Sequence, residues 1–210
     1  MKLRVGICED DPFTLATLSA ALELEEVEIS FAATNASDAI DGFKNKQPAA
    51  VLLDLHLGEG PTGLDLSRNL RKISPDVGIV FLTSFESPKL IASDSYEMPS
   101  GSQYINKREA NSIEVILRAI QQSIKKDRKT SVPDNFGVSG LTNKQLSVLQ
   151  MIAQGHTNSE ISKQLAMNPK SVEGMSKRIA TKLGLEPDQN KNQRIQMAKA
   201  YLKGIGRVLD

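Results

Sequence analysis

The sequence has little of several features that would define a class of protein. In 210 residues it has one cysteine, Cys8, no tryptophan and only 4% aromatic residues. A single cysteine excludes an internal disulfide framework and fits a reducing compartment. No run of about 18 apolar residues occurs, so we expect no membrane span. The first residues also lack the apolar stretch and cleavage site of a signal peptide. These absences predict a cytoplasmic protein with no membrane partner.

Charge is divided unevenly along the chain, although the net charge is only +1. Residues 1–124 contain 11 Lys and Arg against 18 Asp and Glu, a net charge of −7. Residues 125–210 contain 15 against 7, a net charge of +8. An acidic half joined to a basic half suggests two tasks, the basic one with a polyanionic partner. At this point, uneven surface charge without a function stays open as the alternative.

Short apolar runs alternate with amphipathic stretches through the first 124 residues. The runs predict strands at 3–8, 27–33, 49–54, 77–83 and 102–105. The stretches between them predict helices at 13–25, 37–46, 63–73 and 109–124. Such alternation predicts an α/β doubly wound, flavodoxin-like five-stranded parallel sheet with helices on both faces. Residues 86–101 have weak helical periodicity and contain two prolines, so we expect a short or distorted helix there.

The pattern changes in the basic half. Residues 125–138 are charged and then broken by proline, which predicts a linker between a domain at 1–124 and a domain at 139–210. The second domain has helix signals only. Thr142 with Gln145 and Thr157 with Glu160 form capping-box patterns, and Asn168 is an N-cap before a first-turn proline, Pro169. We predict a small all-α domain in which helices at 158–165 and 168–183 form a helix-turn-helix.

Polar side chains follow four of the predicted strands. Glu9 and Asp10 follow the first strand, Asp54 ends the third, Thr83 ends the fourth, and Lys107 closely follows the fifth. The carboxyl ends of parallel strands meet at one edge of a sheet. Converging carboxylates require a cation, and oxygen ligands with open positions suit Mg²⁺. The pattern favours phosphoryl transfer to Asp54 as nucleophile, with Thr83 and Lys107 contacting the phosphoryl oxygens.

This set of residues resembles the receiver domain of two-component response regulators. The resemblance covers residues 3–124 and is carried by Glu9-Asp10, Val51-Leu52-Leu53-Asp54-Leu55, Thr83-Ser84, and Tyr104 three residues before Lys107. It implies phosphorylation of Asp54 by a histidine kinase. It also implies that Mg²⁺ is held by Glu9, Asp10, Asp54 and the backbone carbonyl of His56. Thr83 and Tyr104 would form the switch pair that transmits the signal.

The basic half resembles the LuxR-type DNA-binding domain of the NarL/FixJ response regulators. The similarity spans about residues 141–203 and is carried by Leu141-Thr142, Val148-Leu149, Gly155, Asn158, Glu160-Ile161, Leu165, Ser171-Val172-Glu173 and Lys182-Leu183-Gly184. It implies that residues 169–183 form the recognition helix in the major groove of double-stranded DNA. The last helix would be the dimer surface.

The recognition helix supplies the candidate DNA contacts. They are Lys170, Ser171, Glu173, Gly174, Lys177, Arg178 and Lys182. We predict that the basic residues supply most of the affinity, whereas Glu173 contributes to base choice by accepting a hydrogen bond from a cytosine amino group. Gly174 is unfavourable inside a helix by about 1 kcal/mol. Glycine at this position either allows the helix backbone to approach DNA closely or is merely tolerated by the helix.

Together these features predict a transcription-controlling response regulator. Phosphorylation of Asp54 would drive formation of a homodimer and operator binding, with no enzyme activity beyond Mg²⁺-dependent self-phosphorylation and slow dephosphorylation. Two alternatives stay open. One is a phosphorylation-independent transcription factor whose receiver is a dimerisation or ligand-sensing module. The other is an aspartyl-phosphate hydrolase, in which His56 would stand where such enzymes usually need a second carboxylate.

Overall fold

The chain folds into two compact units. The computed structural model describes residues 2–85, 87, 90, 98–125, 130, 140–186, 188 and 191–206. The first unit contains residues 1–84 and 97–133, and the second contains residues 85–96 and 134–210. Most of the predicted helix at 86–101 lies outside the described residues, as does most of the predicted linker. Within the described residues, no helix has the length and apolar character needed to cross a membrane.

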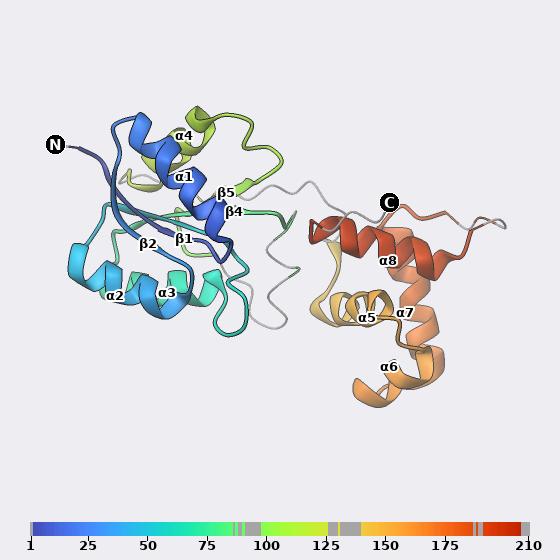
Figure 1. The fold of residues 1–210 in the computed structure, drawn as a ribbon. Helices are drawn as coiled ribbons and strands as arrows, with labels where there is room; N and C mark the ends of the chain where they lie inside the picture. The colour runs from blue at the N-terminus through green and yellow to red at the C-terminus, as the bar shows by residue number, and fades with distance from the viewer. Residues whose placement is uncertain are drawn as a thin grey trace. The chain divides into compact units, whose positions relative to one another are not determined.

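The first unit is the predicted doubly wound sheet. Its parallel strands are β1 (Arg4–Cys8), β2 (Glu28–Ala33), β3 (Ala50–Leu53), β4 (Gly78–Thr83) and β5 (Gln103–Asn106), in the order β2-β1-β3-β4-β5. The helices are α1 (Pro12–Leu24), α2 (Ala36–Lys46), α3 (Gly63–Ile73) and α4 (Ile113–Ser123). Figure 1 shows α1 and α4 covering one face of the sheet and α2 and α3 covering the other. Every residue of β3 and β4 is buried, because helices cover both faces.

The helix boundary in the first unit that differs most from prediction is the start of α4. The pattern predicts a helix from residue 109, but the structure begins it at Ile113 after Ser112. The intervening backbone instead forms a turn, in which the amides of Glu109 and Ala110 both donate to the carbonyl of Asn106. This turn keeps the residues after β5 at the edge of the sheet.

The second unit contains helices only among its described residues. They are α5 (Asn143–Ala153), α6 (Asn158–Gln164), α7 (Pro169–Lys182) and α8 (Gln193–Gly204). Both predicted capping boxes are present, and the Asn168 side chain caps α7. The last helix begins at Gln193, because the Asn192 side chain caps it by accepting from the amides of Arg194 and Ile195.

One apolar cluster holds the second unit together. Its fully buried members come from all of α5, α6 and α7, and they are Val148, Leu149, Ile161, Val172, Ile179 and Ala180. Met197 and Tyr201 bring α8 into the same cluster. Leu90, which follows β4, is also a member, and the partly buried Phe85 packs against the cluster. Apolar periodicity is weak in this stretch, so its packing against the cluster could not be predicted from the residue pattern.

The sheet register brings the polar strand ends together. The last residue of β1, Cys8, lies beside Leu53 at the end of β3, and Leu53 lies beside Phe81 of β4. The backbone then continues the pairing past the strands, since the Asp54 amide donates to the Cys8 carbonyl at 2.9 Å. The Lys107 amide likewise donates to the Thr83 carbonyl at 2.8 Å. The four strand ends therefore share one edge of the sheet.

Candidate functional site: an acidic pocket and a basic recognition helix

Three carboxylates converge at this edge. One ligand oxygen from each of Glu9, Asp10 and Asp54 lies within 4.8 Å of the others. Glu9 and Asp54 are buried, with 2% and 6% of their surfaces exposed, whereas the Asp10 side chain is 34% exposed. Only oxygen donors are present, in a cluster of the size that one divalent cation spans, so the residues fit a hard cation such as Mg²⁺. The cluster predicted from the strand ends is thus confirmed as a possible metal site.

Lys107 lies between the two buried carboxylates. Its Nζ is 2.8 Å from Glu9 Oε1 and 2.7 Å from Asp54 Oδ2. Burial alone would lower the pKa of Lys107, but the charge and hydrogen bond of Asp54, together with those of Glu9, outweigh that effect and raise it. The ammonium therefore stays charged and holds Asp54 at a fixed position beside Glu9.

The neighbouring acid Asp11 has a structural role. Its carboxylate caps α1 by accepting from the Thr14 amide at 2.7 Å, and hydrogen bonds from the Thr14 side chain and amide lower the pKa of Asp11. The next helix in the chain, α2, begins in the same way with the Asn35 side chain accepting from Asp38. Of the acidic run at residues 9–11, the first two members enter the pocket and the third starts the helix.

His56 lies beside the pocket on the loop that leaves β3. Its amide donates to Asp54 Oδ1 at 3.2 Å, and its ring Nδ1 is 3.5 Å from Asp10 Oδ2. The ring is 59% exposed, so it borders the entrance to the carboxylates. The backbone near His56 thus already contacts Asp54 through a hydrogen bond.

The residues predicted as the switch pair are both buried. Thr83 ends β4 and is completely buried, and its carbonyl positions Lys107 through the backbone hydrogen bond described above. Tyr104 lies on β5 beside Phe81 and is 5% exposed. Both side chains are therefore buried, Thr83 at the shared edge where the strands end and Tyr104 within the neighbouring strand.

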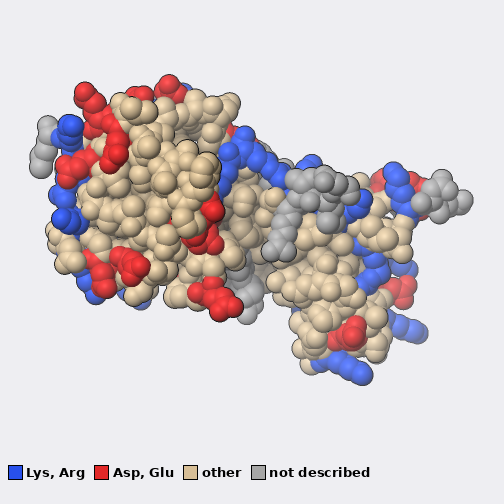
Figure 2. Space-filling view, viewed as in Figure 1, with Lys and Arg blue, Asp and Glu red and all other residues tan. Residues whose placement is uncertain are grey.

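In the second unit, α7 separates into a packed face and an open face. Val172, Ile179 and Ala180 are buried against the apolar cluster. Six of the seven predicted DNA contacts are exposed and Gly174 is half-buried. In Figure 2 the charged side chains visible on this unit are mostly blue Lys and Arg, whereas the first unit shows both red and blue side chains. The open face of α7 thus carries the charge that a polyanion requires.

Family comparisons agree with both halves of this geometry. Residues 5–121 match the response regulator receiver domain, and residues 139–198 match the luxR family of bacterial regulatory proteins. The chain belongs to the response regulator family. As a family these proteins are regulators and not catalytic enzymes, which argues against the hydrolase alternative.

The similarity to named relatives extends over most of the chain. The response regulator is 23% identical to the oxygen regulatory protein NreC of Staphylococcus epidermidis over 88% of this chain and 92% of that protein. It is 26% identical to the transcriptional regulatory protein DesR of Bacillus subtilis over 86% of this chain and 90% of that protein. The chain therefore spans nearly the full length of both relatives.

Solved structures support the fold. A complex of the two-component response regulator RcsB with DNA matches with a TM-score of 0.61 at 22% identity, covering 98% of this chain and all of that one. RcsB from Salmonella enterica serovar Typhimurium, bound to a promoter in the presence of the phosphomimetic BeF₃⁻, matches with a TM-score of 0.61 at 21% identity. That match covers 98% of this chain and 100% of that one. At this identity the likeness shows that the response regulator has the RcsB fold.

Gly63 is a site residue that sequence reasoning missed. It is the first residue of α3, and its amide donates to the Leu55 carbonyl at 2.9 Å. A Cβ atom at this position would lie 1.9 Å from the backbone oxygen of Asp54. The helix thus packs directly on the backbone of the phosphoacceptor candidate. Only this distance identifies the constraint, since Gly63 otherwise resembles any glycine near a helix start.

Lys182 has a structural role that the prediction of DNA contacts did not anticipate. Its Nζ donates to the Gly140 carbonyl at 2.5 Å and to Gln145 Oε1 at 3.1 Å, so it ties the end of α7 to the start of α5. Lys177 instead forms an ion pair with Glu173 at 3.0 Å on the open face. This pair lowers the pKa of Glu173 and keeps the carboxylate ionised. The basic residues of α7 are therefore not equivalent.

The Glu9 carboxyl should give the receiver domain a pH-dependent stability. Burial, with a smaller contribution from the Asp54 charge, raises the pKa of Glu9 from 4.5 to about 7 even though Lys107 opposes the shift. The unfolded chain loses this proton at the lower pH and the folded chain at the higher. The folded state thus binds more protons in between, and its stability falls as pH rises through this window.

We expect Glu9→Gln to remove this fall, which amounts to at most about 3 kcal/mol. Urea unfolding of both proteins at several pH values between about 5 and 8, without divalent cations, measures it. Titrating groups outside the pocket contribute equally to both proteins. Equal slopes for the wild type and the variant would contradict the assignment to Glu9.

Proposed function

We propose that a histidine kinase phosphorylates Asp54 and that the phosphorylated chain dimerises and binds operator DNA to control transcription. The observation that carries the proposal is the contact between Lys107 and Asp54 within the carboxylate cluster. An Asp54 oxygen attacks the phosphorus of a phosphohistidine, the phosphorus–nitrogen bond breaks, and the imidazole leaves with the electron pair. No further co-reactant is needed.

The pocket residues have separate tasks in this transfer. Glu9, Asp10, Asp54 and the backbone carbonyl of His56 would hold Mg²⁺, whose charge neutralises the transferring phosphoryl group. Lys107 exchanges its contact with Asp54 for one with a phosphoryl oxygen, which is a short movement because the ammonium is only 2.7 Å away. Thr83 donates its hydroxyl to another phosphoryl oxygen, and Tyr104 packs behind it.

The second unit supplies the output. We propose that α7 enters the major groove of double-stranded DNA, as the helix-turn-helix geometry allows. Lys177 and Arg178 contact phosphates or bases, and Glu173 contributes to base choice. NreC and DesR are named as regulatory proteins, and the RcsB structures include two dimers bound to DNA. A dimer doubles the contacts made to paired half-sites, so phosphorylation that favours dimers strengthens binding.

One experiment tests input and output together. The full chain is incubated with acetyl phosphate and Mg²⁺, phosphate incorporation is quantified by mass spectrometry, and DNA sites are selected from a random pool with and without phosphorylation. We expect one phosphate per chain and tighter binding of a paired site by the phosphorylated protein. A chain that takes no phosphate yet selects DNA equally well would instead support the phosphorylation-independent transcription factor.

Two lysines of α7 should give opposite results on substitution. We expect Lys177→Ala to weaken binding to all DNA sequences and to reduce the slope of log affinity against log salt by about 1. Lys182→Ala should leave that slope nearly unchanged and lower the stability of the second unit by about 1 kcal/mol, because it removes the hydrogen bonds to α5. Fluorescence anisotropy at several salt concentrations and urea unfolding measure the two effects. Identical effects of the two substitutions would contradict this division of tasks.

Gly174 offers a test of how closely α7 approaches DNA. A Cβ atom at Gly174 would meet nothing within 4 Å, so the protein itself does not require glycine there. We expect Gly174→Ala to stabilise the second unit by about 1 kcal/mol through helix propensity. The same substitution should weaken DNA binding if the backbone approaches the groove closely. A more stable second unit with unchanged DNA affinity would show that glycine at this position has no role in DNA binding.

A further inference from the structure

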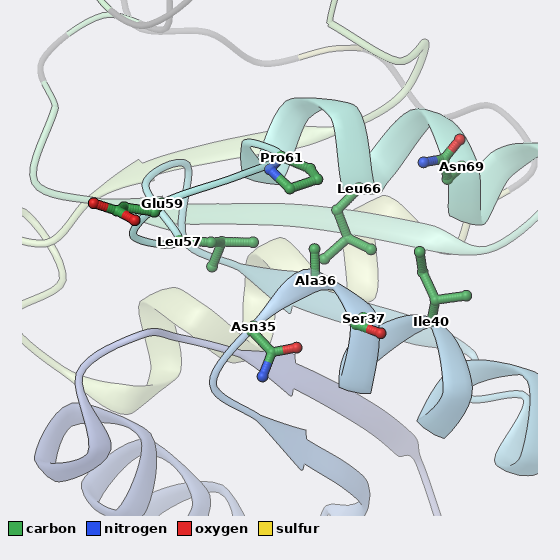
Figure 3. A pocket seen from close by; sticks show the side chains of 9 residues that line it. All are labelled: Asn35, Ala36, Ser37, Ile40, Leu57, Glu59, Pro61, Leu66 and Asn69. Carbon is green, nitrogen blue, oxygen red and sulfur yellow. The ribbon is translucent and has the colours of Figure 1, made fainter.

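A cavity of about 380 Å³ lies in the first unit between α2, the loop from β3 to α3, and α3 itself. Figure 3 shows side chains from all three elements around this hollow, with Glu59 at its outer edge. None of its lining residues belongs to the carboxylate cluster or to Lys107 and Thr83. The cavity is therefore separate from the phosphoacceptor site, although the loop that forms one wall begins at Asp54.

The cavity has an apolar interior. Five of its lining residues are apolar and come from α2, the loop and α3, namely Ala36, Ile40, Leu57, Pro61 and Leu66. In Figure 3, Leu57, Leu66 and Ala36 lie close to one another at the centre of the view. A volume of this size is at the lower end of the range of small-molecule sites. The interior thus fits a compact apolar body.

The rim of the cavity sets the charge that a ligand can carry. Four polar residues line it, namely Asn35, Ser37, Glu59 and Asn69. The Asn35 side chain is already hydrogen-bonded within the protein, because it accepts from the Asp38 amide and donates to the Asp38 carboxylate at 2.8 Å. Glu59 is the only charged residue in the lining, which contains no Lys, Arg or His. Glu59 is also exposed, and it forms no ion pair with any other described residue.

We propose that this cavity binds a compact, mainly apolar molecule that carries an amine. The apolar body lies against Leu57 and Leu66, and the ammonium faces Glu59. An anionic molecule of the same shape is disfavoured, because Glu59 repels it and no cation compensates. This site would make the receiver a ligand-binding module in addition to a phosphoacceptor, and it does not depend on phosphorylation of Asp54.

Three probes that share one ring system test the proposal. Tryptamine is cationic, indole is neutral and indole-3-acetate is anionic. Each is titrated into the full-length chain, and amide chemical shifts are followed by NMR. We expect saturable shifts centred on residues 35–40 and 57–61. Because Glu59 is exposed, the preference for tryptamine should be roughly threefold over indole and about tenfold over indole-3-acetate.

Two variants and a control complete the test. Ser37→Leu adds bulk at an exposed lining position and should weaken binding of all three probes at least about tenfold. Glu59→Gln should leave indole unchanged and abolish the preference for tryptamine. Glu23→Gln removes an exposed carboxylate on α1 and should leave the affinities for all three probes unchanged. The absence of saturable shifts in this region would overturn the proposal, as would equal affinity of wild type for the anionic and cationic probes. The Glu59 result stands alone if Ser37→Leu does not fold.

Discussion

Replacing Asp54 with asparagine should abolish phosphorylation of the receiver domain and the gain in DNA affinity that depends on it. The amide has the shape of the carboxylate but lacks the anionic oxygen that attacks phosphorus. Phosphorylation adds roughly two negative charges at one point, and couplings of this kind typically change affinity by about 5–150-fold. We expect the whole of that change to disappear in Asp54→Asn. The remaining affinity should equal that of the unphosphorylated wild type.

The measurement combines mass spectrometry after treatment with acetyl phosphate and Mg²⁺ with anisotropy on the selected DNA site. Asp41→Asn is the matched control, because Asp41 is an exposed carboxylate on α2 outside the pocket. It should be phosphorylated and should bind DNA like the wild type. If Asp54→Asn still incorporated phosphate, or still bound DNA more tightly after the treatment, Asp54 would not be the acceptor.

Gly63→Ala should have the second large effect, although Gly63 carries no side chain to take part in chemistry. The new methyl carbon would lie 1.9 Å from the Asp54 backbone oxygen and 2.9 Å from its carbonyl carbon. A backbone cannot move aside like the end of a flexible side chain, so either α3 or Asp54 must shift. Overpacking of this kind typically costs 1–3 kcal/mol, and here we expect about 3 kcal/mol or more.

The rate of phosphorylation should fall with this stability, because Asp54 moves relative to Lys107. Urea unfolding and the initial rate with acetyl phosphate measure the two effects. Gly140→Ala is the matched control, since an added Cβ there meets nothing within 4 Å. Wild-type stability and rate in Gly63→Ala would show that the helix start can move without disturbing the acceptor.

Much of the receiver could be predicted because its local signals agree with its tertiary structure. Alternation of buried strands with amphipathic helices fixed the fold class, and parallel topology placed the ends of four strands together. Glu9, Asp10, Asp54 and Lys107 therefore converge as expected. In the second unit, the side-chain caps at Thr142, Thr157 and Asn168 set the helix starts, because capping depends only on neighbouring residues.

Other properties could not be predicted, because they depend on distances between residues far apart in the sequence. The ties from Lys182 to Gly140 and Gln145 span 42 and 37 residues, so the sequence pattern gave only an exposed lysine on a helix. The open space at Gly174 likewise required coordinates. The pairing of Glu173 with Lys177 is local, at a spacing that favours it, and could have been noted from the sequence.

By itself, then, the sequence determined the alternating fold, the helix-turn-helix and the identity of the acidic pocket, because periodicity and strand order are local or topological properties. Tertiary structure alone decided the raised pKa of Glu9, the close packing of α3 on Asp54 and the cavity beside the phosphoacceptor loop. Each of these depends on which atoms surround a group in the folded state, and burial and contact distance have no signature in residue spacing.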